Sequence, residues 1–180
     1  MNPLDIIRTH YDPDSDCYAI LLAHSRDVAD KALEIARMHP EMNLDLPFIE
    51  EAALLHDLGI VYTDAPDIDC HGMADYICHG YLGAEILRKA GFPRHARVCE
   101  RHTGTGLSLR DIEARGLPVP HRDMRPETLE EQLICFADKF FSKTKLHKEK
   151  PVEKIRAGLA RYGTESVARF DNWHKLFLGE

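Results

Sequence analysis

The sequence predicts an all-α fold for this chain of 180 residues. In nearly every periodic segment, apolar residues recur three or four positions apart, which is the spacing of an amphipathic helix. Capping residues, prolines and glycines stand where these helices would begin and end. No segment alternates apolar and polar residues convincingly enough to predict a strand. We therefore expect a multi-helix bundle in a single domain, residues 1–180, of which residues 147–180 form a C-terminal helical extension.

The first part of the chain predicts four helices. Asp14 or Ser15 can cap a long first helix that runs to about Met38. Pro47 suits the first turn of the second helix, and Gly59 is expected to close it. The approximate ranges expected for the four helices are 15–38, 47–59, 75–91 and 93–102.

The remaining segments predict two irregular stretches and four further helices. Residues 61–72 combine proline, glycine and several aspartates, and residues 117–126 contain three prolines, so both predict loops. Ser108 can cap a short helix that stops at Gly116. The other expected helices span about 127–145, follow Pro151, and begin at a cap on Thr164.

Composition and charge narrow the function classes. A net charge of −7 argues against broad binding of extended nucleic acid. It does not exclude a small anionic substrate, because a metal ion reverses the local field. No apolar run approaches the roughly 18 residues of a membrane span, and the N-terminus lacks the layout of a signal peptide. We therefore expect a cytoplasmic protein without a membrane partner.

The cysteine pattern predicts free thiols rather than disulfides or a zinc knuckle. The cysteines are odd in number and form no CxxC motif, as expected in a reducing compartment. Cys70-His71 and Cys78-His79 could be imagined as zinc ligands, but their spacing fits no common structural zinc pattern. The five are Cys17, Cys70, Cys78, Cys99 and Cys135.

The pair His56-Asp57 closes the apolar run Ala-Ala-Leu-Leu and is the strongest sign of a functional site. Two strong metal ligands at the end of an apolar helix predict a metal-binding site, and other parts of the chain contain further residues that could bind the same metal. Imidazole nitrogen and carboxylate oxygen suit divalent transition metals such as Fe, Mn, Zn, Co or Ni. The predicted ligands are His24, His56, Asp57, His79, His102 and Asp138.

We expect these ligands to hold two metal ions that share Asp57. A carboxylate has two oxygens and can bridge two ions, whereas an imidazole offers one nitrogen to each ion. One ion would take His24, His56, Asp57 and Asp138, and the other would take Asp57, His79 and His102. Two ions about 3.5–4 Å apart can hold the attacking and leaving oxygens of a phosphoryl displacement, with water activated to hydroxide as the nucleophile.

The predicted catalytic residues are Asp57, Arg101 and Lys139, of which the two cations would contact substrate phosphates or the developing charge. Lys143 lies one helical turn beyond Lys139 and is a weaker candidate for the same role. His71 is the residue most apt to replace His79 as a ligand. The expected substrate is a small phosphorylated compound of the nucleotide type.

His24, His56-Asp57 and Asp138 resemble the H…HD…D signature of the HD-domain metal-dependent phosphohydrolases, over about residues 19–143. His79-Gly80-x-x-Gly83-Ala84 and His102-Thr103-Gly104 are similar to the branch of symmetrically cleaving diadenosine tetraphosphate hydrolases. The resemblance implies an all-helical HD fold and the ligand partition above, with a second metal that is often iron. Two features depart from the wider family: no lysine follows the HD pair closely, and no GYP motif is present.

Three other functions remain open from the sequence. The chain could be an HD nucleotidase with a single metal ion, a metal-dependent sensor that binds nucleotides without catalysis, or a purely structural helical protein. A homodimer is also open, because Phe170, Trp173 and Phe177 share one face of the last predicted helix. That face predicts either core or dimer contacts.

Overall fold

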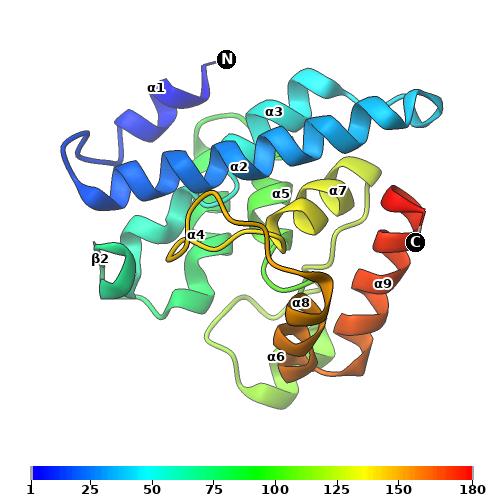
Figure 1. Ribbon diagram of the computed structural model, residues 1–180. Coiled ribbons are helices and arrows are strands. Elements are labelled where there is room, and N and C mark those ends of the chain that lie inside the picture. Colours follow the sequence, from blue (N-terminus) through cyan, green and yellow to red (C-terminus); the bar gives the residue numbers. More distant parts are fainter. Residues whose placement is uncertain (1, 180) are drawn as a thin grey trace.

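The computed structural model describes residues 2–179 and confirms the all-α fold (Figure 1). Short 3₁₀ turns and one small hairpin accompany the α-helices. The α-helices are α1 Pro3–Arg8, α2 Asp16–Met38, α3 Leu46–Leu55, α4 His79–Lys89, α5 Pro93–Arg101, α6 Leu109–Arg115, α7 Leu129–Asp138, α8 Val152–Leu159 and α9 Thr164–Leu178. The 3₁₀ turns are η1 Pro40–Met42, η2 Leu58–Tyr62, η3 Pro66–Ile68, η4 Tyr76–Cys78 and η5 Ala160–Tyr162, and the strands are β1 Asp64–Ala65 and β2 Cys70–His71.

The helices surround α7, which lies near the middle of the molecule (Figure 1). The helix α7 contacts α2, α3, α5 and α9, while α2 packs along α3 and α4 packs along α5. The main apolar core joins α2, α3, α7 and α9 around the buried rings of Phe136, Phe170 and Phe177. Burial of these large rings is a major source of stability. This core packs together α2, α3 and α7, the helices that carry or directly precede His24, His56-Asp57 and Asp138.

Several helix boundaries follow from the capping chemistry that the sequence contains. The Ser15 hydroxyl accepts a hydrogen bond from the Tyr18 amide at the start of α2. At the start of α7, Thr128 and Glu131 form a reciprocal capping box. Gly116 ends α6 in the left-handed conformation that glycine adopts without a steric cost. These ends agree with the sequence-based bounds to within one or two residues.

The predicted helix over residues 127–145 ends earlier, at Asp138. A longer helix would place Lys139 and Lys143 one turn apart on the same face, where like charges repel. Instead the chain turns back, and the Lys143 ammonium lies 2.6 Å from Asp57 Oδ2. The turn therefore gives Lys143 an ion pair with Asp57.

Two other sequence-based boundaries were wrong. Gly59 does not close α3, which ends at Leu55; it lies within η2, where a Cβ would stand 2.1 Å from the His79 carbonyl oxygen. Residues 61–72 are not a plain loop, because β1 and β2 pair there as a two-residue antiparallel hairpin. Strands this short carry no alternation that a sequence pattern could reveal.

Within residues 147–179, the helix α9 packs against α7 and α8 packs against α9. Phe170 and Phe177 are fully buried and Trp173 nearly so, which makes their face part of the chain's own core. The helix α9 begins at Thr164, with Gly163 rather than Thr164 as its N-cap. None of the described helices has the length and apolar character needed to cross a membrane.

Candidate metal centre

All six predicted ligands converge on one buried site, and five of them lie at or next to a helix end. His24 comes from the middle of α2. His56 and Asp57 follow α3, and His79 is the first residue of α4. His102 directly follows α5, and Asp138 is the last residue of α7. No ligand side chain is more than about a tenth exposed.

The first half-site, which we define as His24, His56, Asp57 and Asp138, places four ligand atoms close together. His24 Nε2 lies 3.0 Å from Asp138 Oδ1 and 3.2 Å from Asp57 Oδ2. His56 Nε2 lies 3.0 Å from Asp57 Oδ2 and 3.4 Å from Asp138 Oδ1. Ligand atoms bound to one ion at about 2.1 Å lie roughly 3.0 Å apart in octahedral and 3.4 Å apart in tetrahedral geometry. The observed separations therefore fit a single ion.

The second half-site, defined as Asp57, His79 and His102, uses the other oxygen of the same aspartate. His79 Nε2 and His102 Nε2 lie 3.4 Å and 3.2 Å from Asp57 Oδ1. The two ring nitrogens are 3.0 Å from each other. Asp57 thus presents Oδ2 to the first half-site and Oδ1 to the second, as a bridging carboxylate would.

Backbone carbonyls orient three of the four imidazoles. The Nδ1 atoms of His56, His79 and His102 lie 2.6–2.7 Å from the carbonyl oxygens of Ala53, Tyr76 and Cys99, three residues earlier in each case. A carbonyl oxygen can only accept, so each Nδ1 carries a proton and each ring points its Nε2 atom into the site, where it can bind an ion once any proton on it is displaced. Such carbonyl contacts are typical of metal-bound histidines.

Two observations show that these residues fit a metal ion. The facing Nε2 lone pairs of His79 and His102 repel each other unless a cation lies between them. His56 Nε2 and both oxygens of Asp57 are buried without a hydrogen bond of normal geometry. Buried polar atoms without hydrogen bonds are costly. Lys143 offsets this cost only at Asp57 Oδ2, and divalent ions would provide ligation for all three atoms.

The surroundings of each group set its protonation. Burial lowers the pKa of His56, but Asp57 and Asp138 outweigh this effect and raise it to about 9. Burial, together with the neighbouring His102, lowers the pKa of His79 to about 3, and burial also lowers the pKa of His102.

The two carboxylates stay ionised although they are buried. Burial raises the pKa of Asp57, but His56 and Lys143 outweigh it and hold the pKa well below its usual range. For Asp138, Lys139 outweighs burial in the same way and keeps the pKa low. Both half-sites therefore contain a carboxylate ready to bind a cation.

Two lysines and a tyrosine complete the inner surface of the site. Lys139 Nζ lies 2.7 Å from Asp138 Oδ2, and Lys143 Nζ lies 2.6 Å from Asp57 Oδ2. The Tyr76 ring stacks on the His79 ring, with their centroids 4.6 Å apart. The sequence made Lys143 only a weak candidate, because the predicted helix extended through the turn that brings this lysine to the site. No pattern in the sequence indicated Tyr76.

The structure does not bring Arg101 to the ligand cluster. Its guanidinium donates to the Arg125 carbonyl and to Glu127 Oε1, which makes an ordinary ion pair. His71 is also outside the cluster, since it is exposed and contacts Asp69. Neither of the ligand groups found among residues 2–179 includes Cys70 or Cys78, and all five cysteines are free thiols, as predicted.

Cavities open directly onto the site. One of about 510 Å³ contains His24, Asp138, Lys139 and Lys143, and it is walled on one side by residues 64–68. Another, of about 260 Å³, touches His79 and His102. The first has the size of a small-molecule site, and the second is slightly smaller than such sites usually are.

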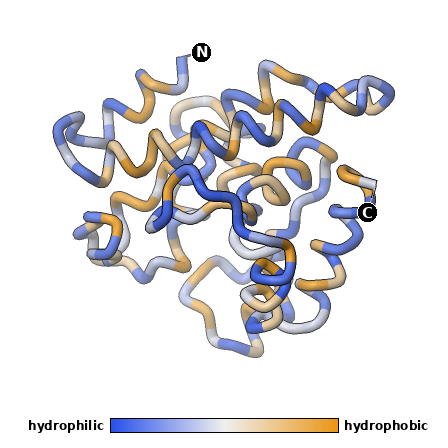
Figure 2. Tube along the Cα trace, viewed as in Figure 1, coloured by the Kyte–Doolittle hydropathy of each residue, from blue (hydrophilic) through white to orange (hydrophobic). Residues whose placement is uncertain are grey.

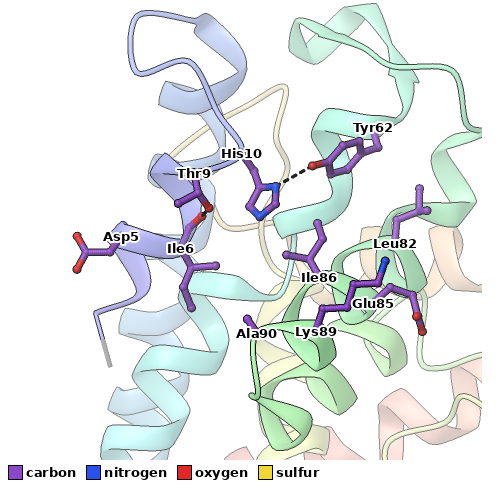
Figure 3. A pocket seen from close by; sticks show the side chains of 10 residues that line it. All are labelled: Asp5, Ile6, Thr9, His10, Tyr62, Leu82, Glu85, Ile86, Lys89 and Ala90. Carbon is purple, nitrogen blue, oxygen red and sulfur yellow. Dashed lines mark hydrogen bonds between the residues drawn. The ribbon is translucent and has the colours of Figure 1, made fainter.

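A larger cavity of about 810 Å³ lies elsewhere, between α1 and α4. Figure 3 shows its side chains, among them Ile6 and Ile86 on opposite walls and the hydrogen bond of 2.8 Å between His10 Nδ1 and the Tyr62 hydroxyl. None of the six ligands lines it. Cavity size alone would therefore place the functional site in the wrong region.

Comparison with known proteins gives one family and several relatives. The HD domain family model matches residues 21–142. A protein of Methanocaldococcus jannaschii with no characterised function is 34% identical over 132 residues, which are 72% of this chain and 70% of the relative. No solved structure matches.

Two further relatives are named tRNA (cytidine(56)-2'-O)-methyltransferase. The one from Picrophilus torridus is 34% identical over 140 residues, or 73% of this chain and 37% of the relative. The one from Thermoplasma volcanium is 28% identical over 162 residues, or 89% of this chain and 43% of the relative. The chain thus spans about two fifths of the length of these two relatives, and their names do not support the diadenosine tetraphosphate hydrolase branch.

Proposed function

The chain belongs to the HD domain family, and from this membership we propose that it is a metal-dependent phosphohydrolase with two metal ions. The proposed substrate is a small phosphorylated compound of the nucleotide type. One observation carries the proposal: the two oxygens of Asp57 face two separate groups of buried ligand atoms. A shared carboxylate of this kind can hold two ions at the short spacing that two-metal phosphoryl transfer uses.

The chain's own residues can hold both ions. His24, His56 and Asp138 would hold one with Asp57 Oδ2, and His79 and His102 would hold the other with Asp57 Oδ1. Divalent ions bound there would polarise a phosphoryl oxygen and lower the pKa of water. The carbonyl contacts of the imidazoles fix the ring orientations before anything binds, so little reorganisation is needed.

Lys139 is the proposed contact for the transferred phosphoryl group. Its ammonium lines both cavities that open on the site, at 2.7 Å from Asp138 Oδ2. Burial lowers the pKa of this lysine, but Asp138 outweighs burial and raises it, so the side chain is cationic at neutral pH. A fixed cation beside the site stabilises negative charge that develops on phosphoryl oxygens. Arg101 is not included, because its guanidinium is engaged with Glu127.

The test is turnover by metal-reconstituted protein. The protein is purified without metal, loaded with Mn, Fe, Co, Ni or Zn, and assayed against nucleotides, dinucleoside polyphosphates and cyclic nucleotides. We expect hydrolysis of at least one class, and its loss in Asp57→Ala. Tight nucleotide binding without turnover would instead support the sensor hypothesis. One ion per chain in an active protein would support the mononuclear nucleotidase.

The names of two relatives make methyl transfer to tRNA a second candidate. The matched part is 37–43% of those proteins, so the activity in their name can reside outside it. Incubation with tRNA and a methyl donor tests this candidate in parallel. We expect no methyl transfer by this chain, because the metal ligands and cavities described above provide for phosphoryl chemistry.

A further inference from the structure

A third cavity beside the metal centre is lined by cations. It has a volume of about 450 Å³ and lies against α8 and η5. Lys139, Lys150, Lys154 and Arg161 line it, and no acidic residue does. In a chain with a net charge of −7, such a gathering of one sign is unexpected from composition alone.

Most of these cations have no ionic partner in the protein. Lys139 pairs with Asp138, but Lys150, Lys154 and Arg161 form no ion pair within residues 2–179. Many other cations of the chain do, including Arg97, which contacts both Glu127 and Glu131. Unpaired cations that share one cavity repel each other, and a bound anion removes that repulsion.

Lys150 lies among charges of both signs. Burial lowers the pKa of its ammonium, and Lys139, Lys143 and Lys154 add to this effect against the opposing influence of Asp138. Its position follows from the main chain, because the Lys150 amide donates to the Phe140 carbonyl and so ties this segment to the end of α7. The side chain is therefore held at the edge of the metal centre.

The cation-lined cavity adjoins the two cavities at the candidate metal centre. Lys139 and Tyr162 line both this cavity and the one that touches His79 and His102. Lys139 and Lys150 also line the cavity that contains His24 and Asp138. Figure 2 shows the segment between α7 and α8, which supplies Lys150, as a hydrophilic stretch across this face. An anion in the cavity would thus be adjacent to a phosphoryl group at the metal ions.

We propose that this cavity is a second phosphate subsite, so that the substrate carries at least two phosphate groups, as a nucleoside di- or triphosphate does. This inference rests on the proposed phosphohydrolase function. One phosphoryl group lies at the metal ions, and the remaining phosphates reach past Lys139 to Lys150, Lys154 and Arg161. Arginine suits the outer position, since its guanidinium forms two parallel hydrogen bonds to phosphate oxygens.

The test combines one double variant with a matched control. Lys154→Ala/Arg161→Ala removes two exposed cations of the subsite, and Lys175→Ala removes an exposed lysine on α9 outside it. The metal-loaded proteins are assayed with a nucleoside triphosphate and with p-nitrophenyl phosphate, which has a single phosphate. The binding of inorganic tripolyphosphate is measured by calorimetry at two salt concentrations.

We expect the double variant to lose about tenfold in tripolyphosphate affinity, with a weaker salt dependence. Its kcat/KM should fall about tenfold more for the triphosphate than for p-nitrophenyl phosphate, while Lys175→Ala follows the wild type on both. Equal effects on both substrates, or unchanged tripolyphosphate binding, would overturn the subsite.

The outcomes separate this inference from the proposed function. If no phosphate ester is hydrolysed but the double variant loses tripolyphosphate binding, the hydrolase proposal fails and the anion subsite stands. If the wild type hydrolyses p-nitrophenyl phosphate as well as the triphosphate and the double variant matches it, the subsite fails and the hydrolase stands. Preference for a 5'-triphosphorylated RNA over a nucleoside triphosphate would overturn the small-molecule assignment.

Discussion

The two half-sites share Asp57 but differ in charge. The first contains two carboxylates, two nearby ammonium groups and His56, which Asp57 and Asp138 keep protonated to about pH 9 against the effect of burial. The second contains one carboxylate oxygen and two histidines that burial keeps neutral. In the metal-free protein, protons and lysines balance the first half-site, whereas nothing comparable balances the second. An ion entering the first must therefore displace a proton, and one entering the second need not.

The largest effect should come from removing the shared ligand. Asp57→Asn leaves one weak oxygen ligand in place of a bridging carboxylate, so both half-sites should lose their ions. We expect metal content to fall close to zero and kcat/KM to drop on the order of 1000-fold. Elemental analysis and steady-state kinetics check this, with the exposed Asp14→Asn as control. Full metal content in Asp57→Asn would refute the shared-ligand geometry.

Substitutions on one side should remove one ion and spare the other. His79→Ala should reduce the metal content from two ions to one and lower kcat/KM by at least about 100-fold. His24→Ala should do the same at the first half-site. Native mass spectrometry of each variant counts the ions. A His79→Ala protein that keeps wild-type metal content and activity would show that His79 is not a metal ligand.

The pH dependence of metal binding should differ between the half-sites. The raised pKa of His56 means that its imidazolium stabilises the metal-free fold fully below pH 6.5, and this contribution is lost as the pH rises through about 9. An ion must displace that proton, so affinity at the first half-site should fall about tenfold per unit below pH 9. His79 has a pKa of about 3, so its half-site should change little between pH 5 and 8.

Calorimetric titrations of His79→Ala and His24→Ala, which isolate the first and the second half-site, measure this difference. In two buffers with different ionisation enthalpies, the first half-site should release about one proton per ion at pH 7.5, beyond any lost from metal-bound water. Equal proton release at both half-sites would show that the protonation states differ from those described here.

The close contact between η2 and α4, which connects the two half-sites, should be sensitive to a single added methyl group. Gly59 follows the His56-Asp57 pair closely, and a Cβ there would meet the His79 carbonyl oxygen at 2.1 Å and the Gly83 amide nitrogen at 2.5 Å. Gly59→Ala must separate η2 from α4, so we expect a loss of about 1–3 kcal/mol in unfolding free energy. Gly158→Ala is the matched control, because only Arg161 lies near its Cβ and alanine favours the helix. Denaturant unfolding compares the two; equal stability would contradict the close contact.

The sequence was sufficient for the ligand cluster but not for its surroundings. His56-Asp57 stood out because strong ligands ended an apolar run, and the other ligands followed from the need for partners of the same chemistry. Lys143 could not be placed, because its position depends on where α7 ends, and its partner Asp57 is distant in sequence. The contact of Arg101 with Glu127 could not be predicted either, since adjacency to His102 gives no information about it.

The same limit applies to the hairpin and to Gly59. The strands β1 and β2 have two residues each, too few for a periodic pattern, and only their pairing in three dimensions defines them. Gly59 was interpreted as a helix stop, the commonest local role of glycine at such a position. Its actual role depends on the main chain of α4, which approaches it from a separate segment.

The most direct test of the shared Asp57 is a crystal structure of the metal-loaded protein with anomalous data at the metal absorption edge. If Asp57 is shared, we expect two anomalous peaks about 3.5–4 Å apart, one next to each oxygen of Asp57. The first should lie among His24, His56 and Asp138, and the second between His79 and His102. A single peak at the first half-site, with His79 and His102 bound to no ion, would contradict the sharing of Asp57 by two ions.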